Sequence, residues 1–429
     1  MRPTLAIALG LLATPGLASS DDEMNNPQQH EDFAVGGAFF QQPWVIAPAS
    51  TTARDGLGPL FKANSCLSCH IGHGRGHPPL SDAEPFLSIE VKLAVPAATP
   101  AQQAEAATLG AAPVPVYGLH LQPFGIRDLP GEGTPHFTYT PVTGQFQDGT
   151  RYTLQKPALH ITGLHYGPLA ADTQFSARVA PPLPGMGLLA DIPEAEILAN
   201  ADPDDHNGDG VSGRPNTVWD IAQQKDVLGR FGWKANQPSI AQQSADAFRN
   251  DIGITTHLFP AQPCSAAQTA CQSLPDGGQP ELPDDLLEKV VFHVAHQPAP
   301  PPRDTADPQV QSGRKLFQQA GCAACHVPAF PSLPQSPYTD LLLHDMGVAL
   351  ADNRPEFAAS GSEWRTPPLW GIGLTEQVNG HTRFLHDGRA RNLLEAILWH
   401  GGEGETAKQH VLAMNPSDRD ALLRFLNSL

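Results

Sequence analysis

Two short stretches of this sequence each contain a pair of cysteines followed at once by a histidine. Their residues are Cys66, Cys69 and His70 in the first, and Cys322, Cys325 and His326 in the second. The spacing is typical of c-type haem attachment, in which two thiols add to the two vinyl groups of one porphyrin. The histidine that follows then lies beneath the iron as its proximal ligand. The sequence therefore predicts two covalent haems, with His70 and His326 bound to iron.

Two other kinds of site use closely spaced cysteines. A zinc site needs further ligands, and no second cysteine pair lies near either motif. A thioredoxin-like dithiol needs only the two cysteines, so it does not explain why a histidine follows both pairs. Haem attachment accounts for all three residues of each motif.

The first residues favour export of the chain. Residues 1–18 have the form of a secretory signal peptide, with Arg2 at the start, an apolar run from Leu5 to Ala13 and small residues up to Ala18. A buried first helix is the alternative, which Pro15 makes less favourable. No later apolar run is long enough to span a bilayer. We expect a soluble periplasmic or otherwise exported protein without a membrane span.

The charge of the chain bears on its partners. The formal net charge is −18 over 429 residues, which argues against nucleic acid as a partner. It favours a basic protein, such as a small redox cytochrome, although ordinary solubility is an equally good explanation. The two cysteines outside the motifs, Cys264 and Cys271, are expected to form a disulfide in an oxidising compartment.

Helical patterns surround both motifs. We expect short helices over 56–65 and 308–319 that lead into them, and a closing helix over 419–428 that Asn415 caps. Alternating residues between about 85 and 170 indicate β-hairpins. The predicted fold is mainly α, with two cytochrome c-type domains in tandem and a β-hairpin-rich insertion in the first. The predicted boundaries are 19–225 for the N-terminal haem domain, 226–302 for a helical connector containing the Cys264–Cys271 loop, and 303–429 for the C-terminal haem domain.

An internal repeat favours a duplicated domain. The pattern Pro-Pro-Leu-x-Gly-x-Gly-Leu occurs in residues 181–188 and again in residues 367–374. Each copy follows one cysteine–histidine motif, and the longer first spacing is roughly explained by the β insertion. Chance similarity between two loops rich in proline and glycine is the alternative.

A further loop has the pattern of a cation site. Asp205, Asn207 and Asp209 alternate and are followed by Gly210, as in the first half of a calcium-binding loop. The twelfth position is Asn216, where such loops carry glutamate. Calcium and an ordinary polar turn therefore both remain open.

Taken together, the motifs resemble the dihaem cytochrome c peroxidase and MauG superfamily, and most closely its branch of dihaem oxidoreductases. Besides the two haem motifs, the resemblance rests on residues 178–189, 229–235, 384–388 and 394–396. It implies two cytochrome c domains in one chain, one haem that stores an electron and one that meets peroxide or oxygen. Members of the superfamily differ in substrate, so no particular substrate follows.

The resemblance also implies a sixth ligand for the second haem. Dihaem peroxidases place a methionine fourteen residues after the histidine that corresponds to His386, and MauG places a tyrosine in that role. Here the position is His400, so we expect iron ligation by His326 and His400, with Met346 and Met414 as rivals. The tryptophan that bridges the haems in the family has no clear counterpart, although Trp219 and Trp233 are candidates.

The first haem is expected to be the reactive one, with His70 as its catalytic ligand. No histidine or methionine occurs in residues 211–235, where the repeat places the equivalent of His400. The residues that could reach this iron from elsewhere are His73, His77, His160, His165 and Met186. A peroxidase-like enzyme is the first hypothesis. An electron-transfer cytochrome and a MauG-like or oxygenase enzyme acting on a protein or organic substrate are the alternatives.

Overall fold

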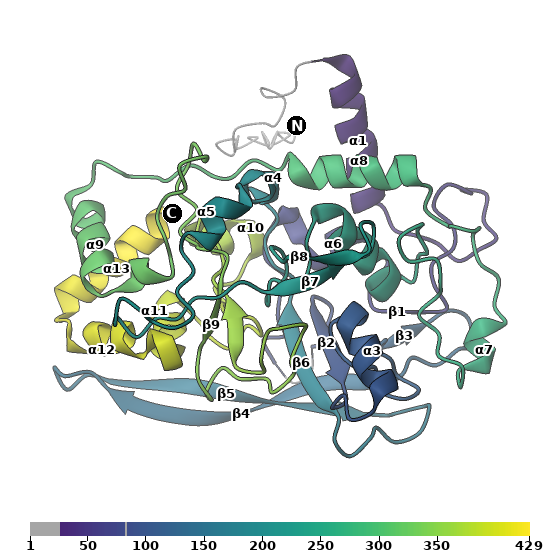
Figure 1. The fold of residues 1–429 in the computed structure, drawn as a ribbon, viewed down its shortest axis with the longest axis horizontal. Helices are drawn as coiled ribbons and strands as arrows, with labels where there is room; N and C mark the ends of the chain where they lie inside the picture. The colour runs from purple at the N-terminus through teal and green to yellow at the C-terminus, as the bar shows by residue number, and fades with distance from the viewer. Residues whose placement is uncertain (1–25, 82–83) are drawn as a thin grey trace, which may run out of the picture.

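The computed structural model describes residues 26–81 and 84–429 (Figure 1). The predicted signal peptide, residues 1–18, lies outside the described residues. Helices account for 32% of the structure and strands for 17%. The fold is therefore mixed and dominated by helices, with small antiparallel strand pairs in place of any large sheet. No helix among the described residues is long and apolar enough to cross a membrane.

The helices follow one another along the whole described chain. They are α1 (Pro27–Gln41), α2 (Cys66–Cys69), α3 (Pro100–Leu109), α4 (Met186–Asp191), α5 (Glu194–Leu198), α6 (Ile240–Ala247), α7 (Thr269–Gln272), α8 (Asp284–Ala295), α9 (Pro308–Gln319), α10 (Thr375–Asn379), α11 (Leu393–Trp399), α12 (Glu405–Ala413) and α13 (Pro416–Ser428). Shorter turns are η2 (Ile71–His73), η3 (Phe248–Ile252), η4 (Cys322–Ala324), η5 (Ile372–Leu374) and η6 (Gly402–Gly404).

In the described part of the chain, the strands pair in twos, and each of these pairs is antiparallel. The pairs are β1 (Leu60–Phe61) with β3 (Phe124–Gly125), β2 (Ile89–Ala94) with β6 (Gln174–Val179), β4 (Thr134–Gln145) with β5 (Arg151–Thr162), β7 (Thr217–Asp220) with β8 (Lys225–Leu228), and β9 (Leu343–Asp345) with β10 (Glu363–Arg365). Antiparallel strands thus occupy much of the segment from about residue 85 to 170, where the alternating sequence pattern predicted β-hairpins.

Helix predictions from the sequence succeed best where a capping residue marks the start. Helix α9 spans the predicted residues, and α13 begins directly after Asn415, whose side chain accepts a hydrogen bond from the Asp418 amide. The helix predicted over 56–65 is wrong. Strand β1 occupies part of that segment, and α2 begins only at Cys66. Gly58 and Pro59 disfavour a helix interior there, and a Cβ on Gly58 would lie 2.4 Å from the Gly253 backbone.

The long hairpin β4–β5 joins distant parts of the chain. It runs beneath the molecule from the strands β2 and β6 toward the C-terminal helices (Figure 1). At its tip the Gln147 amide donates to the Leu412 carbonyl, and Asp148 pairs with Arg419 at 2.7 Å. The Arg419 guanidinium also lies 4.1 Å from the centre of the Phe146 ring. The hairpin therefore fastens the first half of the chain to α12 and α13.

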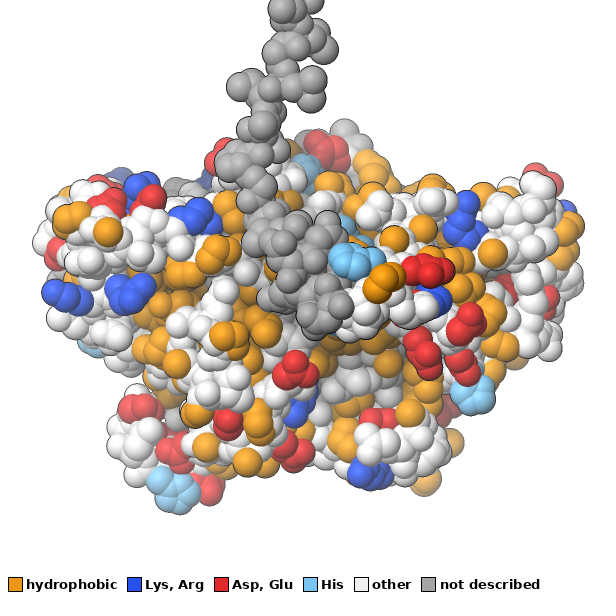
Figure 2. Space-filling view, turned by 90° about the horizontal axis from the view of Figure 1, so that it is seen from above, with side chains coloured by type: hydrophobic (Ala, Val, Ile, Leu, Met, Phe, Trp, Pro, Cys, Tyr) orange, Lys and Arg blue, Asp and Glu red, His pale blue; other side chains and the backbone are white. Residues whose placement is uncertain are grey.

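A buried ionic cluster makes a second connection between the halves. The carboxylate of Glu356 pairs with Lys92 on β2 at 2.9 Å and with Arg178 on β6, and Arg354 lies 3.4 Å away. Because these side chains are almost fully buried, each charge depends on its partners for compensation. On the face drawn in Figure 2, by contrast, acidic and basic side chains are interspersed among apolar ones.

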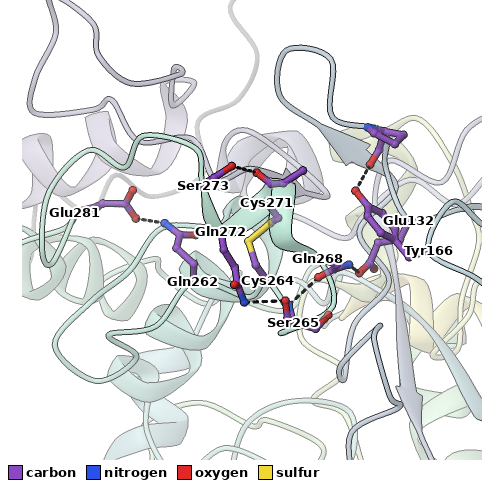
Figure 3. The surroundings of a disulfide bond; sticks show 12 residues. Glu132, Tyr166, Gln262, Cys264, Ser265, Gln268, Cys271, Gln272, Ser273 and Glu281 are labelled. Atoms are coloured by element: carbon purple, nitrogen blue, oxygen red, sulfur yellow. Dashed lines mark hydrogen bonds between the residues drawn. A yellow bond between two sulfur atoms is a disulfide. The ribbon is translucent and has the colours of Figure 1, made fainter.

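The predicted disulfide between Cys264 and Cys271 is confirmed (Figure 3). Between the two cysteines lies Gln268, whose side-chain amide donates to the Glu132 carboxylate at 2.6 Å. Glu132 also accepts a hydrogen bond from the Gln122 amide at 2.7 Å. Burial raises the pKa of Glu132 to about 8. The disulfide therefore closes a loop that is held against the β-rich segment.

Candidate functional site

Each cysteine–histidine motif lies on the wall of a cavity. The C-terminal cavity, of about 290 Å³, is lined by Cys322, Cys325 and His326. The N-terminal cavity, of about 160 Å³, is lined by Cys66, Cys69 and His70. The structure thus brings all three residues of each motif to one space.

The C-terminal cavity contains two histidines suited to metal ligation. His326 donates its Nδ1 hydrogen to the Tyr338 carbonyl at 2.9 Å, and His400 donates its own to the Ala396 carbonyl at 2.7 Å. A hydrogen bond at Nδ1 leaves Nε2 as the nitrogen with a free lone pair. Burial lowers the pKa of His326 to about 4 and also lowers the pKa of His400, so both rings are neutral at pH 7.

The position of His400 follows from helix α11. Asn392 caps this helix, and Leu393, Ala396 and Ile397 line the C-terminal cavity from one of its faces. His400 follows directly after the last helical residue and extends that face. Of the rival ligands suggested by the sequence, Met346 lines the cavity and Met414 does not.

The N-terminal cavity is built around His70 in a similar way. The Nδ1 of His70 donates to the Pro181 carbonyl at 2.8 Å, and burial lowers the pKa of His70 to about 4. Pro181 belongs to the first copy of the sequence repeat, and it lines this cavity together with Leu183. In the second copy, residues 367–369 line the C-terminal cavity. Pro181, Pro182 and Pro184 of the first copy also line the C-terminal cavity, so the first copy lies between the two cavities and the second lines the C-terminal cavity alone.

Most residues that the sequence offered as further ligands of the first haem lie elsewhere. Of the five candidates, Met186 alone lines the N-terminal cavity. The Nε2 atom of His73 is 2.9 Å from Nε2 of His293. On strand β5, His160 bonds to Thr138, while His165 bonds to the Gly131 carbonyl. His77 packs edge-on against His381.

A histidine that sequence reasoning missed, His120, does line the N-terminal cavity. Its Nε2 atom is 3.5 Å from Glu90, and its buried Nδ1 has no hydrogen-bond partner among the described residues. Burial lowers the pKa of His120 well below its ordinary value, with Lys92 and Arg354 acting in the same direction. No motif surrounds His120 in the sequence, so only the tertiary structure identifies it.

The wall formed by α6 and η3 supplies acidic and amide groups. Gln243, Asp246 and Asp251 all line the N-terminal cavity. The turn η3 is a π-helical turn, which changes the direction of the residues that follow α6. Asp246 accepts hydrogen bonds from Asn250 at 2.7 Å and from Gln237 at 3.2 Å.

Asp251 differs from Asp246 in its partners. No hydrogen bond joins its carboxylate to another described residue. Burial raises the pKa of Asp251 to about 7 and that of Asp246 to about 6. Both carboxyl groups can therefore exchange a proton near neutral pH.

Cationic side chains provide a test of whether this cavity fits a haem. Lys62, Lys92 and Arg178 line the N-terminal cavity. Arg178 is 1% exposed, and its Nη2 atom makes no hydrogen bond in the described structure, with the Asp352 carboxylate 3.8 Å away. A propionate of a bound porphyrin would supply the missing hydrogen bond. The thiols, the imidazole and this guanidinium nitrogen together fit a covalent haem.

One tryptophan lies between the cavities. Trp233 lines both of them, whereas Trp219 lines neither. Its indole nitrogen donates to the Val179 carbonyl at 2.8 Å, and the Arg75 guanidinium lies 5.3 Å from the ring centre. Arg75 in turn donates to the Arg383 carbonyl at 2.9 Å. The structure thus distinguishes two tryptophans that the sequence alone offered as equal candidates for the residue between the haems.

The candidate calcium loop forms a network of turns. Asp205 accepts from the Gly210 amide, Asn207 accepts from the Asp209 amide, and Asp209 accepts from the Val211 amide. No group of three or more His, Cys, Asp or Glu side chains in residues 26–81 and 84–429 is arranged to hold a metal ion. Calcium binding by Asp205, Asn207 and Asp209 stays a prediction.

Comparison with known families gives a match over nearly the whole chain. The family model described as “Di-haem oxidoreductase, putative peroxidase” matches residues 14–429, which include both cysteine–histidine motifs. A search of curated proteins finds no match. Among solved structures, hydrazine synthase from Kuenenia stuttgartiensis aligns over 100% of both chains, with 12% identity and a TM-score of 0.35. A likeness that low carries no argument about fold or activity.

Proposed function

Because this chain belongs to the family of di-haem oxidoreductases described as “Di-haem oxidoreductase, putative peroxidase”, we propose that it is an exported peroxidase-like enzyme with two covalent haems. In this proposal the C-terminal haem supplies electrons, and the N-terminal haem reduces peroxide. This assignment of roles to the two haems is based on one observation: the two cavities differ in the number of histidines that could bind iron. The C-terminal cavity has two histidines with Nδ1 bound to a carbonyl, His326 and His400, whereas the N-terminal cavity has only His70.

Although His120 also lines the N-terminal cavity, we do not count it as a second iron ligand there. The propionates of a porphyrin lie on the edge opposite its vinyl groups, and the vinyl edge belongs beside Cys66 and Cys69. The electrostatic neighbours of His120 are Lys92, Arg354 and Glu356, whereas the neighbour of Cys66 is Asp251. In a haem held by Cys66 and Cys69, His120, Lys92 and Arg178 would therefore hold the propionates, and His120 would not serve as a second iron ligand.

When bound, the N-terminal haem would supply an iron centre at which the O–O bond of peroxide can be cleaved. The protein must then move protons, because reducing one peroxide to two waters consumes two protons and two electrons. Asp251 is the group proposed to carry a proton, since it lines the cavity and its carboxylate forms no competing hydrogen bond with another described residue. Gln243 lines the cavity from the same helical segment and can orient the substrate by hydrogen bonding.

Trp233 is proposed to lie on the path of electrons between the haems. It is the only aromatic residue of the described chain that lines both cavities. Its hydrogen bond to Val179 and its contact with Arg75 fix the ring in place. The proposal retains the tandem arrangement of 19–225, 226–302 and 303–429 as haem domain, connector and haem domain. A small basic redox protein, such as a cytochrome, is the proposed electron donor.

The first test is the resting protein expressed with its export signal. Mass spectrometry should show two haem additions, and electron paramagnetic resonance should show one high-spin and one low-spin haem. Turnover of hydrogen peroxide with a reduced cytochrome c should follow. Two low-spin haems and no turnover would instead establish an electron-transfer cytochrome, and oxidation of a protein or organic substrate in preference to peroxide turnover would favour the MauG-like alternative.

A further inference from the structure

A buried histidine lies beside the second cysteine of the C-terminal motif. The Nδ1 atom of His344 is 3.5 Å from Sγ of Cys325 and 2.6 Å from the Glu403 carboxylate, and Nε2 is 2.7 Å from the Asp340 carboxylate. His344 comes from strand β9 and lines the C-terminal cavity. It is 2% exposed, so water does not compete for these contacts.

The geometry determines the protonation state of this imidazole. Each ring nitrogen faces a carboxylate, and a carboxylate accepts hydrogen bonds only, so both nitrogens must carry hydrogen. Burial alone lowers the pKa of His344, but the hydrogen bonds to Asp340, Cys325 and Glu403 outweigh it and raise the pKa to about 12. His344 is therefore an imidazolium throughout the neutral range.

Other donors hold both carboxylates in place. Glu403 also accepts hydrogen bonds from the Ser212 amide at 2.9 Å and from the Asp345 amide at 3.0 Å. Asp340 accepts from the Leu342 amide at 2.9 Å. The cation is thus fixed by a rigid network that includes a residue from the first half of the chain, Ser212.

The N-terminal motif has a corresponding cation. The ammonium nitrogen of Lys62 lies 3.6 Å from Sγ of Cys69, and it donates to the Leu87 carbonyl at 3.0 Å. Lys62 is 5% exposed. No carboxylate among the described residues forms an ion pair with Lys62, whereas His344 has two; Asp251 acts on Lys62 and Cys69 only as a more distant charge. The two motifs therefore share a buried cation at the second cysteine but differ in the charge around that cation.

We propose that His344 and Lys62 set the reduction potentials of the C-terminal and N-terminal haems, each acting on the haem attached to the adjacent cysteine. The inference rests on the two haems of the proposed function. Reduction adds one electron to a haem, so a fixed positive charge at its edge stabilises the reduced state. In a buried site that interaction is weakly screened. Asp340 and Glu403 are positioning residues that hold His344, and their negative charges oppose its effect on the haem.

The test measures the midpoint potential of each haem by spectroelectrochemistry in the full-length holoprotein. His344→Gln should lower the potential of the C-terminal haem only, and Lys62→Met should lower that of the N-terminal haem only. The charge-conserving variants His344→Lys and Lys62→Arg should keep the potentials close to those of the unmodified protein. His296 follows the last residue of α8 and lines neither cavity, so His296→Gln is the matched control and should change neither potential.

Glu403→Gln gives an independent result with the opposite sign. It removes a negative charge while its amide oxygen still accepts from His344, so the C-terminal potential should rise. This variant decides the C-terminal assignment if His344→Gln does not fold. The inference is overturned if His344→Gln moves neither haem or both, or if His344→Lys lowers the potential as far as His344→Gln does. Those results leave the proposed function intact, whereas a protein without haem overturns both.

Discussion

His326 and His400 line the same cavity, each with its Nδ1 hydrogen donated to a backbone carbonyl. One belongs to a cysteine–histidine motif and the other follows helix α11. Both rings are neutral and expose Nε2 as the available lone pair, which is the form that binds iron. In the proposed function, such a pair would ligate the C-terminal haem on both sides and restrict it to electron transfer.

Replacement of His400 by alanine should convert the C-terminal haem from low spin to high spin, because one axial ligand is lost. His400→Met should restore a low-spin haem with a higher potential, since thioether stabilises ferric iron less than imidazole does. Electron paramagnetic resonance and the optical spectrum report both changes. His410→Ala, on the neighbouring helix α12, is the control and should leave the spin state unchanged. A high-spin conversion in Met346→Ala, with none in His400→Ala, would show that the ligand is Met346.

Asp251→Asn should lower peroxide turnover by about 10²–10⁴-fold, the usual contribution of a general acid–base group. Cyanide binding to the N-terminal haem should also slow, because hydrogen cyanide must lose a proton as it binds. Stopped-flow spectroscopy measures both rates. Asp246→Asn is the matched control, since that carboxylate is already held by Asn250 and Gln237. The assignment fails if Asp246→Asn has the larger effect.

Glu356→Gln should reduce the free energy of unfolding by about 3–5 kcal/mol, because it leaves buried cations without their partner. Burial alone raises the pKa of Glu356, but Arg178, Lys92 and Arg354 outweigh it and hold the pKa well below 4.5. The stability from this carboxylate is therefore present above pH 4.5 and is lost as the pH falls below that value.

Chemical denaturation between pH 3 and pH 8 measures this dependence on pH. The loss of stability in Glu356→Gln relative to the unmodified protein should be greatest near neutral pH and should shrink in acid. Exposed Glu376 offers the control, and Glu376→Gln should change stability by no more than about 0.5 kcal/mol. Equal effects of the two variants would contradict the role given to the buried cluster.

Replacing Cys264 and Cys271 by serine should lower stability by about 2–3 kcal/mol, the loop-closure contribution of a short disulfide loop. Thermal unfolding followed by circular dichroism provides the measurement. The serine variant should keep both haem spectra of the unmodified protein, because the loop lies outside both cavities. An unchanged unfolding temperature would show that Gln268 and its neighbours hold the loop without the disulfide.

The sequence by itself determined the parts of this protein that depend on local spacing. The cysteine–histidine motifs need only adjacent residues to define a haem attachment site, so the order of the residues is enough to recognise them. The same holds for α9 and α13, whose starts are marked by the capping residues Asp307 and Asn415. The disulfide was predictable because only two cysteines remained.

Tertiary structure decided the features that depend on residues far apart in the chain. His120, Asp251 and Lys62 reach one cavity from separate segments, and no pattern in their own surroundings marks them. The choice between Trp219 and Trp233 likewise depends on which ring lies between the cavities. The charge on His344 arises from Asp340 and Glu403 together, and Glu403 is brought beside it only by folding. Burial and pairing set these properties, and neither is encoded in local spacing.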